Sequence, residues 1–137
     1  MDSHALEKLE YFVLLNSLSG YADSELGGSW IRTLEPLSEK EHIHARQRLF
    51  DDAGRLLRRG AEPPEFNLTS LDDLLQRVRP QGAVLNGIDL RQCGDFLQCV
   101  SRIKRFLQGE ECDDCSALME LRDNINSCAP LKKALDE

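Results

Sequence analysis

The stretch LEYFVLLNSLSGYADSELGGSWIRTLEP, residues Leu9–Pro36, decides how the fold begins. It holds the strongest apolar run of the chain, Tyr11–Leu15, and the only tryptophan, Trp30. The run is apolar on every side of a helix, which is typical of a segment buried by more than one neighbour. Ser24 is a good N-cap for a second helix, which has to end before Pro36. The stretch therefore predicts two helices in succession.

The second of these helices carries an adjacent glycine pair, Gly27 and Gly28. Each glycine costs about 1 kcal/mol relative to alanine inside a helix. Either the backbone approaches a neighbouring helix closely at this point, or the first turn is frayed. Both interpretations fit the residues.

Working outward, Ser38 and Glu41 form a capping-box pattern, which predicts a long helix that runs to about Arg59 and ends at Gly60. A connector with paired prolines follows, and Ser70 is placed to cap a short helix that ends before Pro80. Asn86 is another N-cap, and we expect the clearest helix after it. That helix is predicted at residues 87–107, and a last pair at residues 116–127 and from 131 onward.

The helical stripes of these segments supply the predicted core. In the helix over 87–107, apolar residues recur in steps of three and four, which is typical of a packing seam towards another helix. We expect Trp30→Ala to cost roughly 3–5 kcal/mol if the ring is buried, whereas a loss under about 1 kcal/mol would place it on the surface. The predicted core residues are Leu9, Leu18, Leu26, Gly27, Trp30, Leu34, Phe96, Val100 and Ile103.

Strand signals are nearly absent, so the predicted fold class is all-α, as an elongated multi-helix bundle. The length of 137 residues suits a single domain. We expect that domain to span 1–137, with a helical part at 1–59, a connector at 60–70 and a second helical part at 71–137. An apolar fraction of 41% is below the usual ~45–50%. Such a shortfall fits a segment cut from a much longer protein.

The composition also excludes several functions. With 24 acidic against 17 basic residues and a net charge of −7, the chain as a whole is a poor nucleic-acid-binding module. It has no apolar run long enough to span a membrane and no secretory signal at its start. Five cysteines without a secretory context indicate free thiols in a reducing cytoplasm.

Cys112 and Cys115 form the most conspicuous motif, and with Cys99 and Cys128 they have the formal spacing of a four-thiolate zinc site. However, Cys99 falls inside one predicted helix and Cys128 at the end of another. The acidic residues beside the CxxC pair should raise the pKa of its thiols and disfavour redox chemistry. We expect ordinary reduced cysteines and no metal, and keep a metal site at Cys112 and Cys115 as the weaker alternative.

Basic residues cluster near the predicted helix ends, where the helix dipole favours cations. The alternative is that they contact nucleic-acid phosphates. No phosphate loop, dinucleotide fingerprint, zinc-protease motif or nucleophile elbow occurs, so we expect no catalytic residues, no bound cofactor and no enzymatic activity in this segment itself. The candidate nucleic-acid contacts are Arg55, Arg58, Arg59, Arg102 and Arg105.

Several short motifs follow one another along the chain: Leu9-Glu10-Tyr11, Tyr21-Ala22, Ser24-Glu25-Leu26-Gly27, Leu34-Glu35-Pro36, Leu56-Leu57, Glu62-Pro63-Pro64, Leu74-Leu75, Gly82-Ala83-Val84-Leu85 and Arg102-Ile103-Lys104-Arg105-Phe106-Leu107. In their order and spacing they resemble the start of the MutS type two proteins, a bacterial branch of the MutS family. The resemblance covers about residues 5 to 108. Phe12 stands where the family tends to have aspartate, and the cysteine-rich loop is not a family signature.

The resemblance implies an N-terminal fragment of a much longer protein, corresponding to part of its core and lever region. The remaining chain would carry a clamp, a homodimeric ATPase that uses ATP and Mg²⁺, and often a nuclease domain. Such proteins are linked to mismatched or branched DNA, recombination suppression and ribosome rescue. The leading hypothesis is thus a structural segment that transmits movement between ATPase and clamp. The alternative hypothesis is a free-standing helical adaptor that binds a partner protein.

Overall fold

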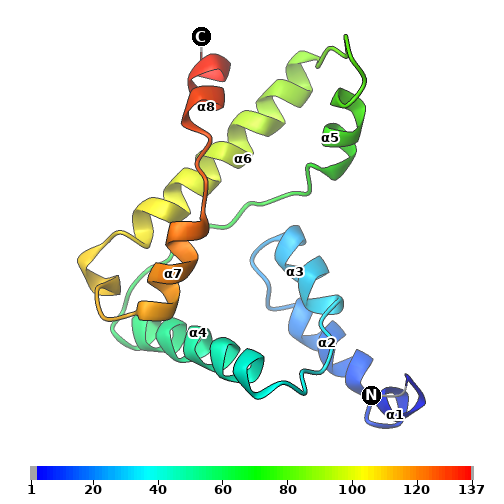
Figure 1. Ribbon diagram of the computed structural model, residues 1–137, viewed down its shortest axis with the longest axis vertical. Helices are drawn as coiled ribbons and strands as arrows, with labels where there is room; N and C mark the ends of the chain where they lie inside the picture. The colour runs from blue at the N-terminus through cyan, green and yellow to red at the C-terminus, as the bar shows by residue number, and fades with distance from the viewer. Residues whose placement is uncertain (1–2, 137) are drawn as a thin grey trace.

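The computed structural model describes residues 3–136, and this part of the chain is all-α (Figure 1). The predicted fold class is confirmed, because the described residues contain eight α-helices and one short 3₁₀ helix but no strand. The elements are α1 (Ser3–Lys8), α2 (Tyr11–Ser19), α3 (Glu25–Arg32), α4 (Lys40–Arg58), α5 (Asp72–Val78), α6 (Gly87–Phe106), the 3₁₀ helix η1 (Glu110–Cys112), α7 (Ser116–Asn124) and α8 (Ala129–Asp136).

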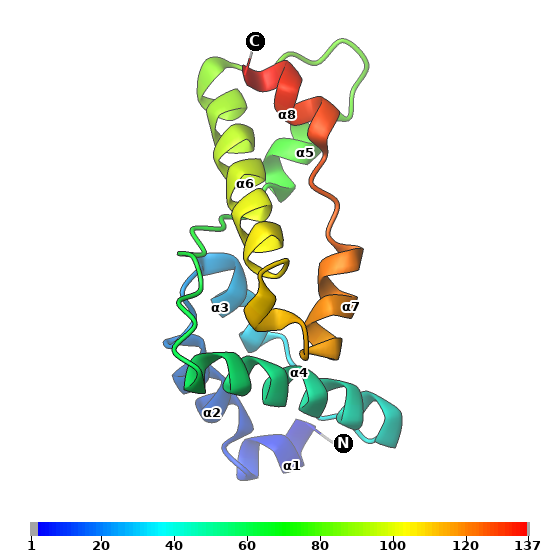
Figure 2. The ribbon, with the colours of Figure 1, turned by 90° about the vertical axis from the view of Figure 1, so that its left-hand side faces the viewer.

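The helices form an open, angular arrangement. Figure 1 shows α4 and α6 as two long arms with α7 near their vertex, and Figure 2 shows α7 rising from α4 beside α6. The chain exposes 10438 Å² to solvent, against ~7,200 Å² expected for a compact monomer of 15.5 kDa. The molecule is therefore elongated, as the sequence predicts. About 3,200 Å² of its surface would be buried in a compact fold of the same mass.

α2 and α3 form an N-terminal hairpin whose close approach explains the glycine pair. Ser24 caps α3 as predicted, since its Oγ accepts the Gly27 N–H at 3.0 Å. Gly28 is buried, and a Cβ atom there would lie 3.3 Å from the Ser19 carbonyl oxygen of α2. Close packing, and not a frayed first turn, is thus the reason for glycine at 28.

α4 begins later than the sequence pattern predicts. The chain has no regular structure at Ser38 and stays extended at Glu39, which takes the N-cap position without a side-chain hydrogen bond. The predicted capping box of Ser38 and Glu41 is therefore wrong. The predicted end is confirmed, because α4 ends at Arg58 and Gly60 adopts a positive φ of 81°.

The connector after α4 runs past the N-terminal hairpin before it reaches α5. The Phe66 N–H donates to the carboxylate of Asp23 at 3.2 Å, and the Leu26 N–H donates to the Leu68 carbonyl at 3.3 Å. Ser70 lies just outside α5, where its Oγ accepts the Asp72 N–H at 3.1 Å.

Asn86 is the N-cap of α6, as predicted. Its side chain accepts the Asp89 N–H at 2.9 Å, and the Asp89 carboxylate accepts the Asn86 N–H at 3.4 Å. These two hydrogen bonds form a capping box. Asp89 also forms an ion pair with Arg77 at 2.7 Å, which lowers the pKa of the carboxyl group mainly through the hydrogen bonds from the guanidinium. This pair fixes α5 against the start of α6.

The predicted core is wrong at three residues of its N-terminal half. Leu9, Leu18 and Trp30 are exposed, and the Trp30 ring is 57% exposed below the Arg46 guanidinium at 5.3 Å. The reason is that α2 packs mainly against α3, so only one side of each helix is covered. The other six predicted core residues are half-buried: Leu26, Gly27, Leu34, Phe96, Val100 and Ile103.

The buried core lies instead where α4, the connector, the end of α6 and the turn before α7 meet. Ile103 packs against its edge. The buried members of this core are Leu56, Ala61, Leu107, Cys112, Cys115 and Leu118.

No helix among the described residues is long and apolar enough to cross a membrane.

Candidate functional site

The most organised polar cluster of the molecule is the joint between α4 and the turn that leads into α7. We call it the charged joint. It is defined by Asp52 and Arg55 on α4 and Arg59 at the C-cap of α4, together with Asp114 and Cys115 of the turn. Asp52, Arg55 and Arg59 stand at i, i+3 and i+7, so they lie on one face of the helix and its C-cap. This face meets the turn 55 to 66 residues further along the chain.

Asp52 caps α7 from a different helix. Its carboxylate is buried, at 5% exposure, and accepts the N–H groups of Ala117 at 2.9 Å and Leu118 at 3.4 Å. Cys115, at the N-cap position of α7, makes no side-chain capping bond of its own. The two amides are those that an N-cap side chain normally satisfies. Asp52 therefore holds the first turn of α7 to the middle of α4.

Asp114 is held by two arginines at the C-terminal end of α4, Arg55 within the helix and Arg59 at its C-cap. Arg59 donates two hydrogen bonds to its carboxylate, at 2.7 and 2.6 Å, and Arg55 donates to its backbone carbonyl at 3.0 Å. The hydrogen bonds from Arg59 lower the pKa of Asp114 to about 2. The same pairing raises the pKa of Arg59. The turn is thus fixed at its backbone and its side chain.

The CxxC thiols lie inside this joint. Cys112 and Cys115 are buried, and their Sγ atoms lie 3.6 and 3.9 Å from the carbonyl oxygens of Phe106 and Asp52. Burial is the main reason that the pKa of each thiol is raised, and the neighbouring carboxylates add to it. The predicted direction of these shifts is confirmed.

The four cysteines of the zinc-like spacing are not brought together. Cys99 lies in α6, where its thiol approaches the Glu65 carbonyl at 3.8 Å, and Cys128 precedes α8. Within residues 3–136, no group of three or more histidine, cysteine, aspartate or glutamate side chains is placed to hold a metal ion. The metal alternative at Cys112 and Cys115 therefore has no further ligands in the described part of the chain.

The structure divides the five arginines that were candidates for nucleic-acid contact. Arg55 and Arg59 are engaged by Asp114, whereas Arg58, Arg102 and Arg105 are exposed. The role of these exposed arginines in nucleic-acid binding stays a prediction.

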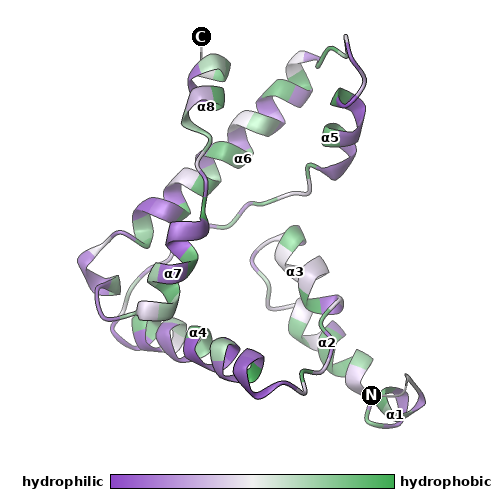
Figure 3. Ribbon diagram, in the orientation of Figure 1, coloured by the Kyte–Doolittle hydropathy of each residue, from purple (hydrophilic) through white to green (hydrophobic). Residues whose placement is uncertain are grey.

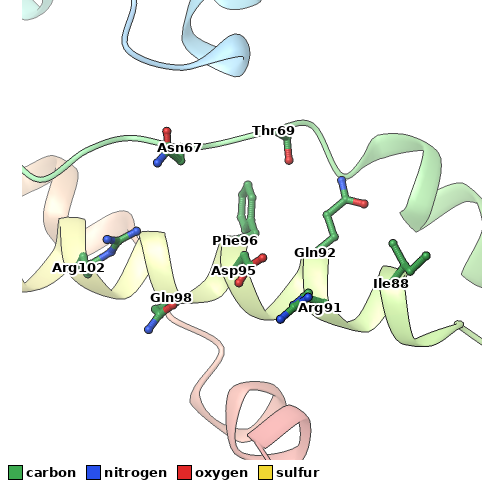
Figure 4. A pocket seen from close by; sticks show the side chains of 9 residues that line it. All are labelled: Asn67, Thr69, Ile88, Arg91, Gln92, Asp95, Phe96, Gln98 and Arg102. Atoms are coloured by element: carbon green, nitrogen blue, oxygen red, sulfur yellow. The ribbon is translucent and has the colours of Figure 1, made fainter.

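Arg102 lies at one end of a shallow groove of about 570 Å³ between the connector and α6 (Figure 4). Figure 4 shows Phe96 projecting from α6 towards the connector near Asn67 and Thr69. The side chains that line this groove include arginine, aspartate and amides but no histidine or cysteine. They do not form an arrangement of nucleophile and base, so this groove offers no evident catalytic chemistry.

Sequence reasoning missed Asp52 and Asp114. The spacing of Asp52, Arg55 and Arg59 on one face of a predicted helix was a usable signal for a polar contact. It could not identify the partner, because the turn at Asp114 is distant in sequence.

Sequence comparison finds curated relatives for most of the chain. The Endonuclease MutS2 of Latilactobacillus sakei is 34% identical over 123 residues, which cover 88% of this chain and 16% of that protein. Those of Pelotomaculum thermopropionicum and Lacticaseibacillus casei are 30% and 29% identical over 137 and 136 residues, each covering 98% of this chain and 17% of the relative. No family model and no solved structure matches the chain.

The chain thus spans about one sixth of the length of the curated relatives it matches. Several of these relatives share the same name, and the similarity extends over nearly the whole chain. The all-α fold is the one that the resemblance implies. The chain belongs to the MutS type two branch of the MutS family.

Proposed function

We propose that the chain is a mechanical segment of a MutS-type protein. Its two long arms, α4 and α6, would act as rigid bodies that transmit movement between an ATPase and a nucleic-acid clamp. The observation that carries the proposal is the charged joint, in which Asp52 and Asp114 fix the turn before α7 to α4. A segment that transmits movement needs a fixed angle between its arms, and packed elements with few alternative arrangements supply it.

The surface of the chain also supports this role. The excess of about 3,200 Å² over a compact monomer is several times the ~800 Å² that a standard interface takes from one partner. Enclosure by the clamp and ATPase parts of a longer chain accounts for such an area. In this proposal the segment performs no reaction itself, and ATP and Mg²⁺ bind elsewhere in the protein.

The nucleic-acid target of the longer protein is also part of this proposal. A protein of this kind would form a homodimer on mismatched or branched DNA and suppress recombination, or act on collided ribosomes. The segment described here has a net charge of −7, so it is unsuited to make the main contact with DNA or with the ribosome, which are both polyanions. Mobility shifts of branched DNA at low salt test that point, and tight binding by the isolated chain would contradict it.

A chimeric protein tests the mechanical role. Residues 1–137 replace the matching segment of the Latilactobacillus sakei relative, and ATP hydrolysis is measured with and without branched DNA. We expect Asp52→Ala to keep the basal rate and to lose most of the stimulation by DNA, because the joint no longer fixes the arms. Asp51→Ala, on the exposed side of α4, is the matched control and should keep both. Full stimulation in the Asp52→Ala chimera would refute the proposal.

One observation favours the adaptor alternative. An apolar hollow of about 270 Å³ lies among α4, the connector, α6 and α7, and its lining includes Leu57, Phe66 and Leu121. A hollow of this kind suits one large apolar side chain of a partner. If the chimera is inactive while the isolated chain binds an amphipathic helix at this hollow, the adaptor function is favoured.

A further inference from the structure

We propose that α7 is a brace between α4 and α6, and that Lys104 of α6 is a positioning residue that holds its far end. Asp52 of α4 already holds the start of α7. With both ends attached, α7 fixes the angle between the two long arms. The inference deepens the mechanical role and rests on it for its functional meaning, but its test uses the chain alone.

Lys104 reaches the C-terminal end of α7 from the last turn of α6. Its Nζ donates a hydrogen bond of 2.8 Å to the backbone carbonyl of Ile125, the C-cap of α7. Both residues are half-buried, and the Ile125 side chain packs against the edge of the buried core. A hydrogen bond from an ammonium group is stronger than one between neutral groups, and partial burial strengthens it further. The contact therefore attaches the end of α7 to α6.

The two attachments of α7 are complementary in charge. The first N–H groups and the last carbonyl groups of a helix have no partner within it, and the helix dipole favours an anion at the start and a cation at the end. α7 receives the anion from α4, where Asp52 accepts the Ala117 N–H at 2.9 Å, and the cation from Lys104 of α6. Each end of α7 is thus held by a different long helix.

Other contacts hold the two ends of α7 unequally. Its first turn supplies the buried Ala117 and Leu118, whereas Figure 3 colours its last turn as hydrophilic. The Arg48–Glu120 ion pair also joins α4 to α7, but it is 3.9 Å long and both side chains are more than half exposed. Exposed pairs of this kind contribute little. The hydrogen bond from Lys104 is therefore the polar contact best placed to stop the end of α7 from moving.

The two attachments act through the same helix. A helix that is held at one end can pivot about that end, so loss of either attachment should release the angle between the arms. The effects of residues that act through one element are not additive. Loss of both attachments should therefore do little more than loss of one, which distinguishes a brace from two independent contacts.

Pulsed electron paramagnetic resonance tests the inference on the full chain. It measures the distances between spin labels on non-natural side chains at position 44 of α4 and position 91 of α6, both exposed. We expect Lys104→Met, which keeps the apolar stem but not the ammonium group, to broaden the distance distribution as much as Asp52→Ala does. The double variant should be no broader than either single variant. Hydrogen exchange of the amides in the last turn of α7 should also become about tenfold faster in Lys104→Met.

Arg105→Met is the matched control, because it removes the same charge from an exposed position beside Lys104 in the last turn of α6. It should leave both the distance distribution and the exchange unchanged. Lys104→Gln is a second test variant. Its shorter side chain does not reach the Ile125 carbonyl, so it should behave as Lys104→Met does.

A distribution as narrow as that of the wild type in both Lys104 variants would overturn the inference, even with faster exchange in α7, because Lys104 would then only cap that helix. So would a double variant that is much broader than both single variants, or an equal effect of Arg105→Met. The measurement involves neither ATP nor DNA, so its failure is distinct from a failure of the chimeric protein.

Discussion

Asp52→Ala is the substitution that probes the charged joint most directly. The change removes the acceptor of the Ala117 and Leu118 N–H groups at the start of α7. Loss of an N-cap costs ~0.5–2 kcal/mol, and a buried amide left without an acceptor costs ~1–3 kcal/mol. Because these two terms overlap, we expect a loss of about 2–3 kcal/mol in the free energy of unfolding.

Equilibrium unfolding in urea, followed by circular dichroism, measures this loss. Asp52→Asn keeps one acceptor oxygen, so its free energy of unfolding should fall by less than about 1 kcal/mol. The comparison of the two variants separates the effect of the hydrogen-bond acceptor from the effect of the charge. Asp51→Ala changes an exposed neighbour on the same helix and should stay within about 0.5 kcal/mol of the wild type. If Asp52→Ala is also within about 0.5 kcal/mol, the reasoning about the joint is refuted.

Three further predictions follow from burial and charge. The folded pKa of Asp114 is about 2, against ~3.9 in the unfolded chain, so its ionised form stabilises the fold above about pH 4 and this contribution is lost as the pH falls towards 2. The stability difference between wild type and Asp114→Asn should therefore be present near neutral pH and vanish in strong acid, and a difference independent of pH would contradict the pairing. Trp30→Ala should cost under about 1 kcal/mol in urea unfolding, because the ring is more than half exposed; a loss of several kcal/mol would show that it is buried. With a thiol reagent, Cys93 and Cys128 should react quickly and the other three cysteines slowly, and rapid reaction of all five would show that the buried thiols are accessible.

Local signals in the sequence predicted the helices well. The caps at Ser24 and Asn86 and the end of α4 near Gly60 follow from hydrogen bonds and φ angles that involve only a few adjacent residues. Such features depend on the residue itself and its nearest neighbours. The Ser38 cap is wrong because the backbone is still extended at Glu39, which takes the N-cap position of α4.

The core was harder to predict, because the periodicity of a helix identifies an apolar stripe but not what covers it. Trp30 lies on such a stripe and is exposed, since α3 packs mainly against α2. Leu118 and Ala61 are buried because segments distant in sequence meet at one vertex. The joint was missed for the same reason, as Asp52 and Ala117 are 65 residues apart.

The central claim is that the charged joint, by fixing the turn between α6 and α7 to α4, holds α4 and α6 at a fixed angle. A measurement of the distance between these two helices tests it most directly. Spin labels on non-natural side chains at positions 44 and 91, both exposed, leave the five native thiols untouched. We predict one narrow distribution of distances between the labels in the wild type and a clearly broader one in Asp52→Ala. A wild-type distribution as broad as that of the variant would contradict the claim.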